Sequence, residues 1–415
     1  MRYWTTIRAM AIMLPDWKPA PCAECGMAGV HHGVERWSLR LDAFLDTFTR
    51  PLDFLFRRIM PWVDRGINFG FPLVSRVLVS LGLATEVEDL SNHPSETAVA
   101  LFEEAKARGI RMTEIRLFGL PRRLYLARFQ NRIWTFGGLP RPARVQPSLS
   151  WIDDKAEMKR RFTRAGFPVA KGGLCKTEAQ AVETFHALSR PVIVKPHEGS
   201  GGRHTTVHIQ TEEELRKAFW NARQVSPYTL VEEELIGPVY RATLVGRKLA
   251  GVLRRDPPCV VGDGRRSIRE LAAEENKNPL RKGPVFAYIQ VDAPESLREL
   301  AWQKLTPESV LPKDAKAFLH FKVNWGVGGT SWDATEETHP ENRKLFEAIG
   351  EYLGDDIAGL DFIISDISKP WQQEKCGIIE CNSLPLIGNH HFPYKGPIRN
   401  VAGKVWDMIF PEARK

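Results

Sequence analysis

The stretch that decides the fold reads VIVKPHEGSGG and occupies residues 192–202. Its apolar start predicts a buried strand, and the glycines predict a loop whose backbone N–H groups can approach phosphate oxygens. It is not a Walker sequence, because Lys195 precedes the glycines, and it lacks the three-glycine spacing of a dinucleotide fingerprint. Taken alone, the loop favours an ordinary turn over a phosphate site.

A second signal lies near the C-terminal end, where GLDFII (359–364) and GIIECN (377–382) each carry an acidic residue. Alternate residues of a strand face the same side, so Glu380 and Asn382 share a face. If the two strands pair antiparallel, Asp361 lies beside Glu380 with Cβ atoms about 5 Å apart. Two carboxylates and an amide are oxygen ligands that suit Mg²⁺. The alternative is that these carboxylates are merely solvated at strand ends.

Helical and strand patterns alternate on both sides of these motifs. Helices are predicted over 155–164, 178–188 and 212–223, and strands over 168–170, 192–194, 229–232, 240–245 and 248–253. Sheets flanked by helices in this manner predict an α+β fold.

The order of these motifs resembles that of the ATP-grasp ligases, and in particular the ATP-grasp domain of cyanophycin synthetase and of bifunctional glutathione synthetases. The motifs are DDK (153–155), VIVKP with its glycine loop, LVEEELIGP (230–238), RRDPPCVVGDG (254–264), NKNP (276–279), NWGVGGTSWDAT (324–335), HP (339–340), LD, IIECN and NHHFPYKGPIRNVAGKVWDMIFP (389–411). The resemblance covers residues 151–411 and implies an ATP-grasp fold, in which two α+β subdomains clasp ATP. It does not extend to the residues before 151.

The resemblance also implies an ADP-forming carboxylate–amine ligase that acts on an amino acid or peptide. The ATP-binding residues would be Lys155, Lys195, Gly199, Ser200, Gly201, Gly202, Glu232, Glu233 and Leu235. Asp361, Glu380 and Asn382 would bind two Mg²⁺ ions, with Mn²⁺ as the alternative. A substrate carboxylate would attack the γ-phosphate and become an acyl phosphate, which an amine then captures. Arg241 and Arg255 would hold the transferring group.

Two positions depart from the pattern of those ligases. Val239 stands where an acidic residue usually meets the ribose hydroxyls, and Pro385-Leu386 stands where cyanophycin synthetase has Pro-Gly. Valine cannot accept a hydrogen bond, so we expect the ribose to be left to water or another acceptor. A glutamate at position 239 is expected to tighten ATP binding if it reaches the ribose.

The composition is that of an ordinary soluble protein: 415 residues, of which 43% are hydrophobic and 26% charged. The longest apolar stretch, around residues 69–83, contains Arg76, so no membrane span is predicted. Six cysteines are too few for a disulfide framework in a chain of this length, which predicts a reducing, cytoplasmic setting. Whether the chain forms homo-oligomers is left open.

Two further units are expected before the ATP-grasp domain (151–411): a helical and loop region of unknown role over 1–90, and a small basic α/β unit with a linker over 91–150. In the second unit we expect a helix over 95–108 and strands over 112–118 and 124–129. Cys22 and Cys25 precede His31 and His32, but the spacing is too short for a zinc finger, which favours free thiols.

Nine arginines and a single acid, Glu114, lie between residues 108 and 144. Such a segment is either a solvated basic face or a surface that attracts nucleic acid or an acidic substrate. Two alternatives to the ligase therefore stay open: a nucleic-acid-associated protein that uses this face, and a non-catalytic ATP-binding scaffold. The retained lysines and candidate metal ligands favour the enzyme.

Overall fold

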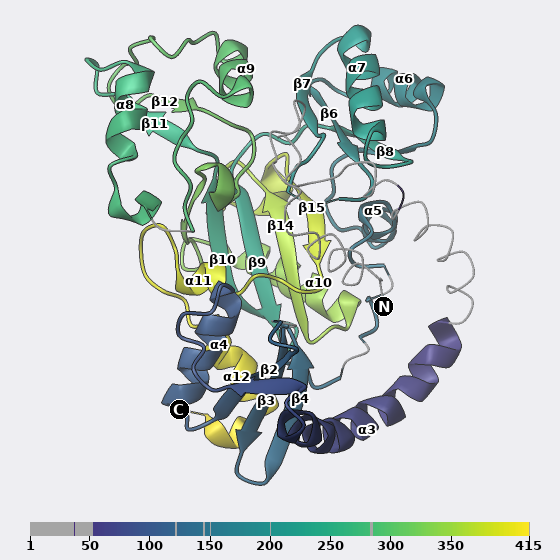
Figure 1. The fold of residues 1–415 in the computed structure, drawn as a ribbon. Helices are drawn as coiled ribbons and strands as arrows, with labels where there is room; N and C mark the ends of the chain where they lie inside the picture. The colour runs from purple at the N-terminus through teal and green to yellow at the C-terminus, as the bar shows by residue number, and fades with distance from the viewer. Residues whose placement is uncertain are drawn as a thin grey trace.

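The computed structural model describes residue 37 and residues 53–120, 123–143, 146–149, 151–199, 201–282 and 285–414. The strands of these residues form four sheets. A five-stranded sheet lies at the centre, two lobes rise above it and a fourth unit lies below (Figure 1). Within the described ranges, no helix combines the length and apolar character that crossing a membrane requires.

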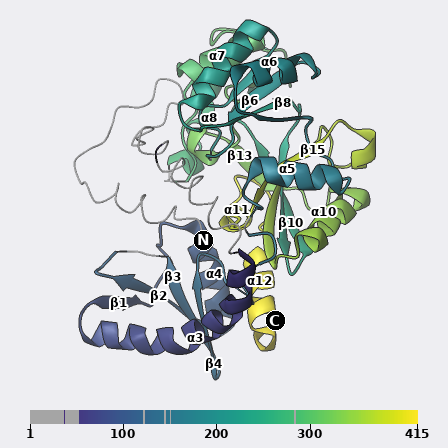
Figure 2. The same cartoon turned by 90° about the vertical axis from the view of Figure 1, so that its right-hand side faces the viewer.

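The lower unit contains a four-stranded antiparallel sheet in the order β1 (Ala84–Val87), β2 (Arg111–Leu117), β3 (Leu124–Phe129) and β4 (Arg132–Gly137). Helices α3 (Asp53–Ser80) and α4 (Glu96–Ala107) accompany it (Figure 2). The predicted helix over 95–108 and both predicted strands are confirmed to within about a residue. We call this sheet with α3 and α4 the N-terminal unit.

A helix from the other end of the chain completes the core of the N-terminal unit. Trp406 of α12 (Val401–Ile409) is fully buried against Leu101, Tyr125 and Phe136, and its indole N–H donates to the carbonyl of Leu101 at 2.9 Å. The last helix is therefore part of the same hydrophobic core as α4 and the first sheet.

The first lobe is a four-stranded antiparallel sheet covered by two helices. Its strands lie in the order β5 (Gly172–Cys175), β8 (Thr229–Glu233), β6 (Val192–Pro196) and β7 (Thr206–Ile209), and its helices are α6 (Glu178–His186) and α7 (Glu212–Arg223). Helix α7 begins at a capping box in which Thr211 and Glu214 bond reciprocally to each other's backbone N–H. The predicted strand over 168–170 is reduced to one bridge, between Val169 and Ile378, and β5 follows it instead.

The central sheet has the order β13 (Thr330–Asp333), β10 (Lys248–Asp256), β9 (Val239–Val245), β14 (Ile357–Ile363) and β15 (Gly377–Asn382), all antiparallel. One face packs on α5 (Lys155–Arg164) and α10 (Pro340–Leu353) through Ala242, Leu244, Leu360 and Phe362. The opposite face carries the polar side chains of the candidate site.

The helices and strands of the second lobe were not predicted from sequence, although the resemblance includes motifs of this region. It contains the strand pair β11 (Cys259–Val261) and β12 (Lys316–Phe318) with helices α8 (Ile268–Glu275) and α9 (Pro294–Trp302). Short helical turns complete the chain: η2 (Pro279–Lys282), η3 (Trp325–Val327), η4 (Trp371–Gln373), α11 (Gly388–His391) and η5 (Pro411–Ala413). The mixture of helices with antiparallel sheets is the α+β fold that the sequence predicts.

Candidate active site

The polar face of the central sheet brings four of the predicted site residues together. In the strand register Arg241 lies opposite Asp361, and Asp361 lies opposite Glu380 as the sequence predicted. Arg255 of β10 lies opposite Val239 of β9. Val239 and Arg241 are two residues apart on β9 and therefore share a face. Because opposed residues and alternate residues share a face, Arg241, Arg255, Asp361 and Glu380 all lie on one side of the sheet.

Arg241 and Asp361 form a buried, bidentate ion pair. Nε and Nη2 of Arg241 lie 2.5 and 2.8 Å from the two oxygens of Asp361. Burial by itself would raise the pKa of Asp361, but Arg241, with smaller contributions from Arg255 and Lys155, lowers it below its ordinary value. Asp361 is therefore a carboxylate at neutral pH.

Arg255 is a cation whose donors are incompletely used. Its side chain is 15% exposed, and its nearest carboxylate oxygen, on Asp361, is 3.8 Å from Nη1. Its Nε is buried without a hydrogen-bond partner, and burial lowers the pKa of its guanidinium. Buried polar atoms are normally satisfied, so this unused donor marks a place where an anionic ligand group fits.

Lys155 connects this face to the glycine loop of the first lobe. Its Nζ donates to the carbonyl of Gly199 at 3.0 Å and lies 3.3 Å from Oε1 of Glu380. Asp154 caps the helix that begins at Lys155 and is also 2.8 Å from Nε2 of His197. The start of α5 is thus tied to the loop that follows β6.

The glycine loop has the backbone that its composition predicted. Gly199, Gly201 and Gly202 all have positive φ, at +124°, +70° and +65°. A side chain at Gly202 would meet Lys322, whose Cγ would lie 3.2 Å from the added Cβ. Lys322 is a buried cation at this loop that the sequence analysis missed. Ser200, also predicted to bind ATP, lies outside the described residues.

Glu232 is held by two lysines beneath the first lobe. Its oxygens lie 2.5 Å from Nζ of Lys159 and 2.8 Å from Nζ of Lys195. Burial opposes ionisation of Glu232, yet the two lysines lower its pKa. Lys159 was not predicted; its pKa is lowered by burial, and it also donates to the carbonyl of Ala170.

The remaining predicted ATP residues follow Glu232 along the chain. Glu233 forms an ion pair with Lys375 at 3.2 Å and accepts from the backbone N–H of Ser189 at 3.2 Å. Leu235 is partly exposed just after β8. The predicted residues therefore form one group around Asp361 and a second around Glu232. Lys155 belongs to the first group and also contacts the glycine loop that follows β6.

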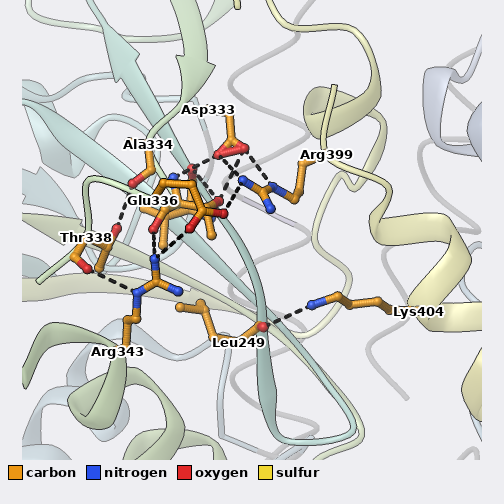
Figure 3. A network of polar contacts seen from close by, with 10 residues as sticks. Leu249, Asp333, Ala334, Glu336, Thr338, Arg343, Arg399 and Lys404 are labelled. Carbon is orange, nitrogen blue, oxygen red and sulfur yellow. Dashed lines mark hydrogen bonds and ion pairs between the residues drawn. The ribbon is translucent and has the colours of Figure 1, made fainter. Parts of the chain in front are cut away.

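The far end of the polar face is closed by the segment that leads into α12. Arg399 donates to Asp333 at 2.8 Å and to Glu336 at 2.9 Å, and Arg343 donates to the carbonyl of Thr338 at 3.0 Å (Figure 3). Nearby, Nε2 of His390 lies 2.8 Å from the hydroxyl of Thr243. His390 and Arg399 thus cover the polar face beside Thr243 and Gly251.

The candidate metal ligands suit a hard cation. Asp361, Glu380 and Asn382 supply carboxylate and amide oxygens, and Nδ2 of Asn382 is buried without a hydrogen-bond partner. Among the residues that the structure describes, no set of three or more His, Cys, Asp or Glu side chains has metal-binding geometry. A metal ion here would share Asp361 with Arg241. Cys22, Cys25, His31 and His32 lie outside the described residues.

Five arginines of the N-terminal unit form ion pairs with carboxylates. Arg108 lies 2.6 Å from both Glu104 and Asp407, and Arg128 lies 2.7 Å from Glu86. Further pairs are Arg111–Glu88, Arg116–Glu114 and Arg132–Glu412. The run of arginines in the sequence therefore does not produce an equal run of unpaired cations.

The chain is similar in sequence to known proteins over the residues that carry these motifs. Residues 154–240 match the family described as the carbamoyl-phosphate synthase L chain, ATP binding domain. A cyanophycin synthetase from Trichormus variabilis is 37% identical over 262 residues, which is 62% of this chain and 29% of that protein. A bifunctional glutathione biosynthesis protein from Mannheimia succiniciproducens is 31% identical over 63% of this chain and 36% of that protein.

A solved structure gives the same result for the fold. The bifunctional glutathione synthetase from Pasteurella multocida superposes with a TM-score of 0.55 and 28% identity, covering 76% of this chain and 43% of that one. The chain spans about a third of the length of the curated relatives it matches. The chain therefore carries an ATP-grasp domain, homologous to those of cyanophycin synthetase and the bifunctional glutathione biosynthesis proteins.

Proposed function

We propose that the protein is an ATP-dependent carboxylate–amine ligase that forms ADP through an acyl phosphate and joins an amino acid or a peptide. The observation that carries the proposal is the charge of the polar face. Among the residues that the structure describes, the ion pairs of Lys155, Arg241 and Arg255 involve two carboxylates, Asp361 and Glu380, and a donor of Arg255 is unused. This excess of positive charge suits the phosphates of a nucleotide and an acyl phosphate.

ATP would bind between the first lobe and the central sheet. Lys155 and Lys195 would neutralise its phosphates, and the backbone of Gly199, Ser200, Gly201 and Gly202 would close over them. The segment from Glu232 and Glu233 to Leu235 would hold the adenine. We assign residues 151–411 to this domain. The expected division at residue 90 lies inside the N-terminal unit, in which β1 (Ala84–Val87) pairs with β2 (Arg111–Leu117).

Asp361, Glu380 and Asn382 would hold Mg²⁺, with two ions or Mn²⁺ as further possibilities to test. When bound, the ions neutralise the charge of the β- and γ-phosphates and orient them. The protein's own contribution is made by Arg241 and Arg255, which bind the oxygens of the transferring group, and by the lobes, which exclude water.

The reaction balances as two displacements. A carboxylate oxygen of the substrate bonds to the γ-phosphorus as the bond to the β-phosphate oxygen breaks, and ADP leaves with that electron pair. The amine nitrogen then bonds to the acyl carbon, phosphate leaves, and the amine releases a proton. Little acid–base chemistry is needed, so positioning and charge stabilisation account for the rate.

The relatives support an amino-acid or peptide substrate, because their names assign them to the synthesis of cyanophycin and glutathione. We propose small-molecule or peptide substrates, a cytoplasmic location and no nucleic-acid or membrane partner. Assembly into a homo-oligomer is not required by the site.

The test is to incubate the protein with ATP, Mg²⁺ and pools of amino acids and short peptides, measuring ADP release and product mass. We expect ADP only when an acid and an amine are both present, with a product equal to their sum less one water. Chelation of Mg²⁺ should abolish the signal. ATP binding without turnover in any pool would support the non-catalytic scaffold instead.

A further inference from the structure

A partly buried contact joins the two lobes outside the candidate active site. His208 of β7 in the first lobe meets α9 of the second lobe, and Figure 1 shows these two elements on the facing sides of the lobes. The His208 ring stacks on Trp302 with centroids 4.3 Å apart and planes 2° apart. Its Nε2 lies 3.5 Å from Oε1 of Glu299. The imidazole therefore touches the second lobe through both its face and its edge.

The same histidine also holds the segment that we assign to adenine. Nδ1 of His208 lies 2.8 Å from Oε1 of Glu234, and the backbone N–H of His208 donates to Oε2 of that residue at 2.6 Å. Glu234 in turn donates its own N–H to the carbonyl of Pro191 at 2.9 Å. Glu234 follows directly after Glu232 and Glu233, so one residue anchors this segment and contacts the opposite lobe.

The backbone of His208 is in a conformation that side-chain-bearing residues rarely adopt. Its φ is +63°, in the left-handed region, and it lies beside a register irregularity between β6 and β7. Irregularities of this kind re-aim side chains at functional positions. Here the local strain is accompanied by two contacts with Glu234 and a stacked aromatic ring.

The charged groups that face His208 are carboxylates. Glu234 follows β8, and Glu299 lies on α9, with side chains 8% and 10% exposed. The basic residues on the neighbouring elements form ion pairs of their own. Arg298 of α9 pairs with Glu295, and Lys195 of β6 pairs with Glu232. Burial alone would lower the pKa of His208, but Glu234 and Glu299 outweigh it and raise the pKa to about 9.

We propose that His208 is a positioning residue that couples contact between the two lobes to nucleotide binding, by holding Glu234 on one side and α9 on the other. The inference rests on the proposed function for the identity of the nucleotide. Neither His208 nor α9 touches the groups assigned to phosphate transfer, so the expected effect is on ATP affinity and on its pH dependence.

The test is calorimetric titration of Mg-ATP into the full chain and three variants. His208→Gln keeps a polar side chain but not the charge, and it should weaken ATP binding about tenfold, within the usual range of coupling between sites. Trp302→Leu removes the stacked ring and should weaken binding in the same direction. The matched control is His186→Gln, which removes a histidine of the same lobe that pairs with Glu212 on the surface, and it should leave affinity unchanged.

The pH dependence separates a positioning role from a merely structural one. Because the pKa of His208 is raised, its ion pairs with Glu234 and Glu299 are fully charged near and below pH 6.5. They are lost as the pH rises through about 9 and the imidazole loses its proton. ATP affinity of the wild type should therefore fall across that upper range, whereas His208→Gln should show no such step. Glu299→Gln removes one carboxylate and should move the step to lower pH.

The outcomes are distinguishable. Wild-type affinity and an unchanged pH step in His208→Gln would overturn the inference and leave the ligase proposal intact. A wild-type protein that binds no ATP would overturn both. If His208→Gln does not fold, as judged by circular dichroism, Trp302→Leu decides the matter: unchanged affinity in that variant overturns the inference.

Discussion

The arginines of the N-terminal unit and Arg255 of the central sheet differ in how fully their donors are used. Arg108 lies between two carboxylates at 2.6 Å, and Arg128 contacts Glu86 at 2.7 Å. Arg255 reaches its nearest carboxylate only at 3.8 Å and buries an Nε without a partner. The N-terminal run is the more conspicuous in the sequence, yet Arg255 has the environment of a ligand-binding group.

The difference shows that the number of charged residues in a segment indicates function less well than whether each charged side chain is paired in the fold. Arg108 and Arg132 find their partners Asp407 and Glu412 at the opposite end of the chain. Such pairs contribute to docking of α12. An incompletely paired, buried cation costs stability and is retained where a ligand completes it.

The largest expected effect is from Arg255→Ala, which should lower kcat by about 10²–10³-fold because one stabilising cation is lost from the reacting centre. The melting temperature should stay the same or rise, since an underpaired buried charge is removed. The matched control is Arg254→Ala: Arg254 points to the other side of β10, where it pairs with Asp256 and lies over Trp332. Equal losses of kcat in the two variants would show that Arg255 has no special role compared with Arg254 on the other face of β10.

A second prediction supplies Arg255 with a partner. Val239 lies directly opposite Arg255, so Val239→Glu places a carboxylate across from the guanidinium. A cross-strand ion pair contributes about 1 kcal/mol, so kcat should fall about fivefold. ATP affinity, measured separately by calorimetry, reports whether the same carboxylate reaches the ribose. An unchanged kcat would show that Arg255 is not drawn to it.

Arg108→Ala should have the opposite effect to Arg255→Ala: it should lower the stability of the fold without a loss of function. Its side chain is 6% exposed and serves two carboxylates, so the free energy of unfolding should fall by about 2 kcal/mol. Urea denaturation measures this loss, and ATP affinity should be that of the wild type. A tenfold weaker ATP affinity would mean that the N-terminal unit acts on the nucleotide site.

The smallest effect is expected from Arg128→Ala. The pair with Glu86 is partly exposed, so its loss should cost less than about 1 kcal/mol. The KM of the substrate and its salt dependence should not change. A higher KM with a weaker salt dependence would instead favour a basic surface that guides an acidic substrate.

The parts of the fold that sequence predicts well are those specified by neighbouring residues. Helices α5 and α7 begin at the predicted residues because Asp154 and Thr211 cap them through contacts within three positions. Asp361 lies opposite Glu380, as the antiparallel pairing of two neighbouring strands predicts, whereas the register irregularity directly after Asp361 was not predicted.

The parts that sequence does not predict depend on distant residues. Strand β5 begins with Gly172 and Gly173, which have no side-chain pattern to indicate a strand, and it forms by pairing with β8. Lys322 belongs to the site only because Gly202, far away in the sequence, packs on its side chain. The roles of individual site residues stay predictions, since no periodicity encodes which donors a ligand will use.

The position of α12 at the end of the chain has a consequence for folding during synthesis. Trp406 fills a core whose other members, Leu101, Tyr125 and Phe136, are synthesised some 300 residues earlier. At translation rates of about 5–20 residues per second, about 15–60 s pass between synthesis of the N-terminal unit and synthesis of α12, which completes its core. During that interval the apolar surface that Trp406 covers in the folded protein is exposed to water, and exposed apolar surface favours aggregation.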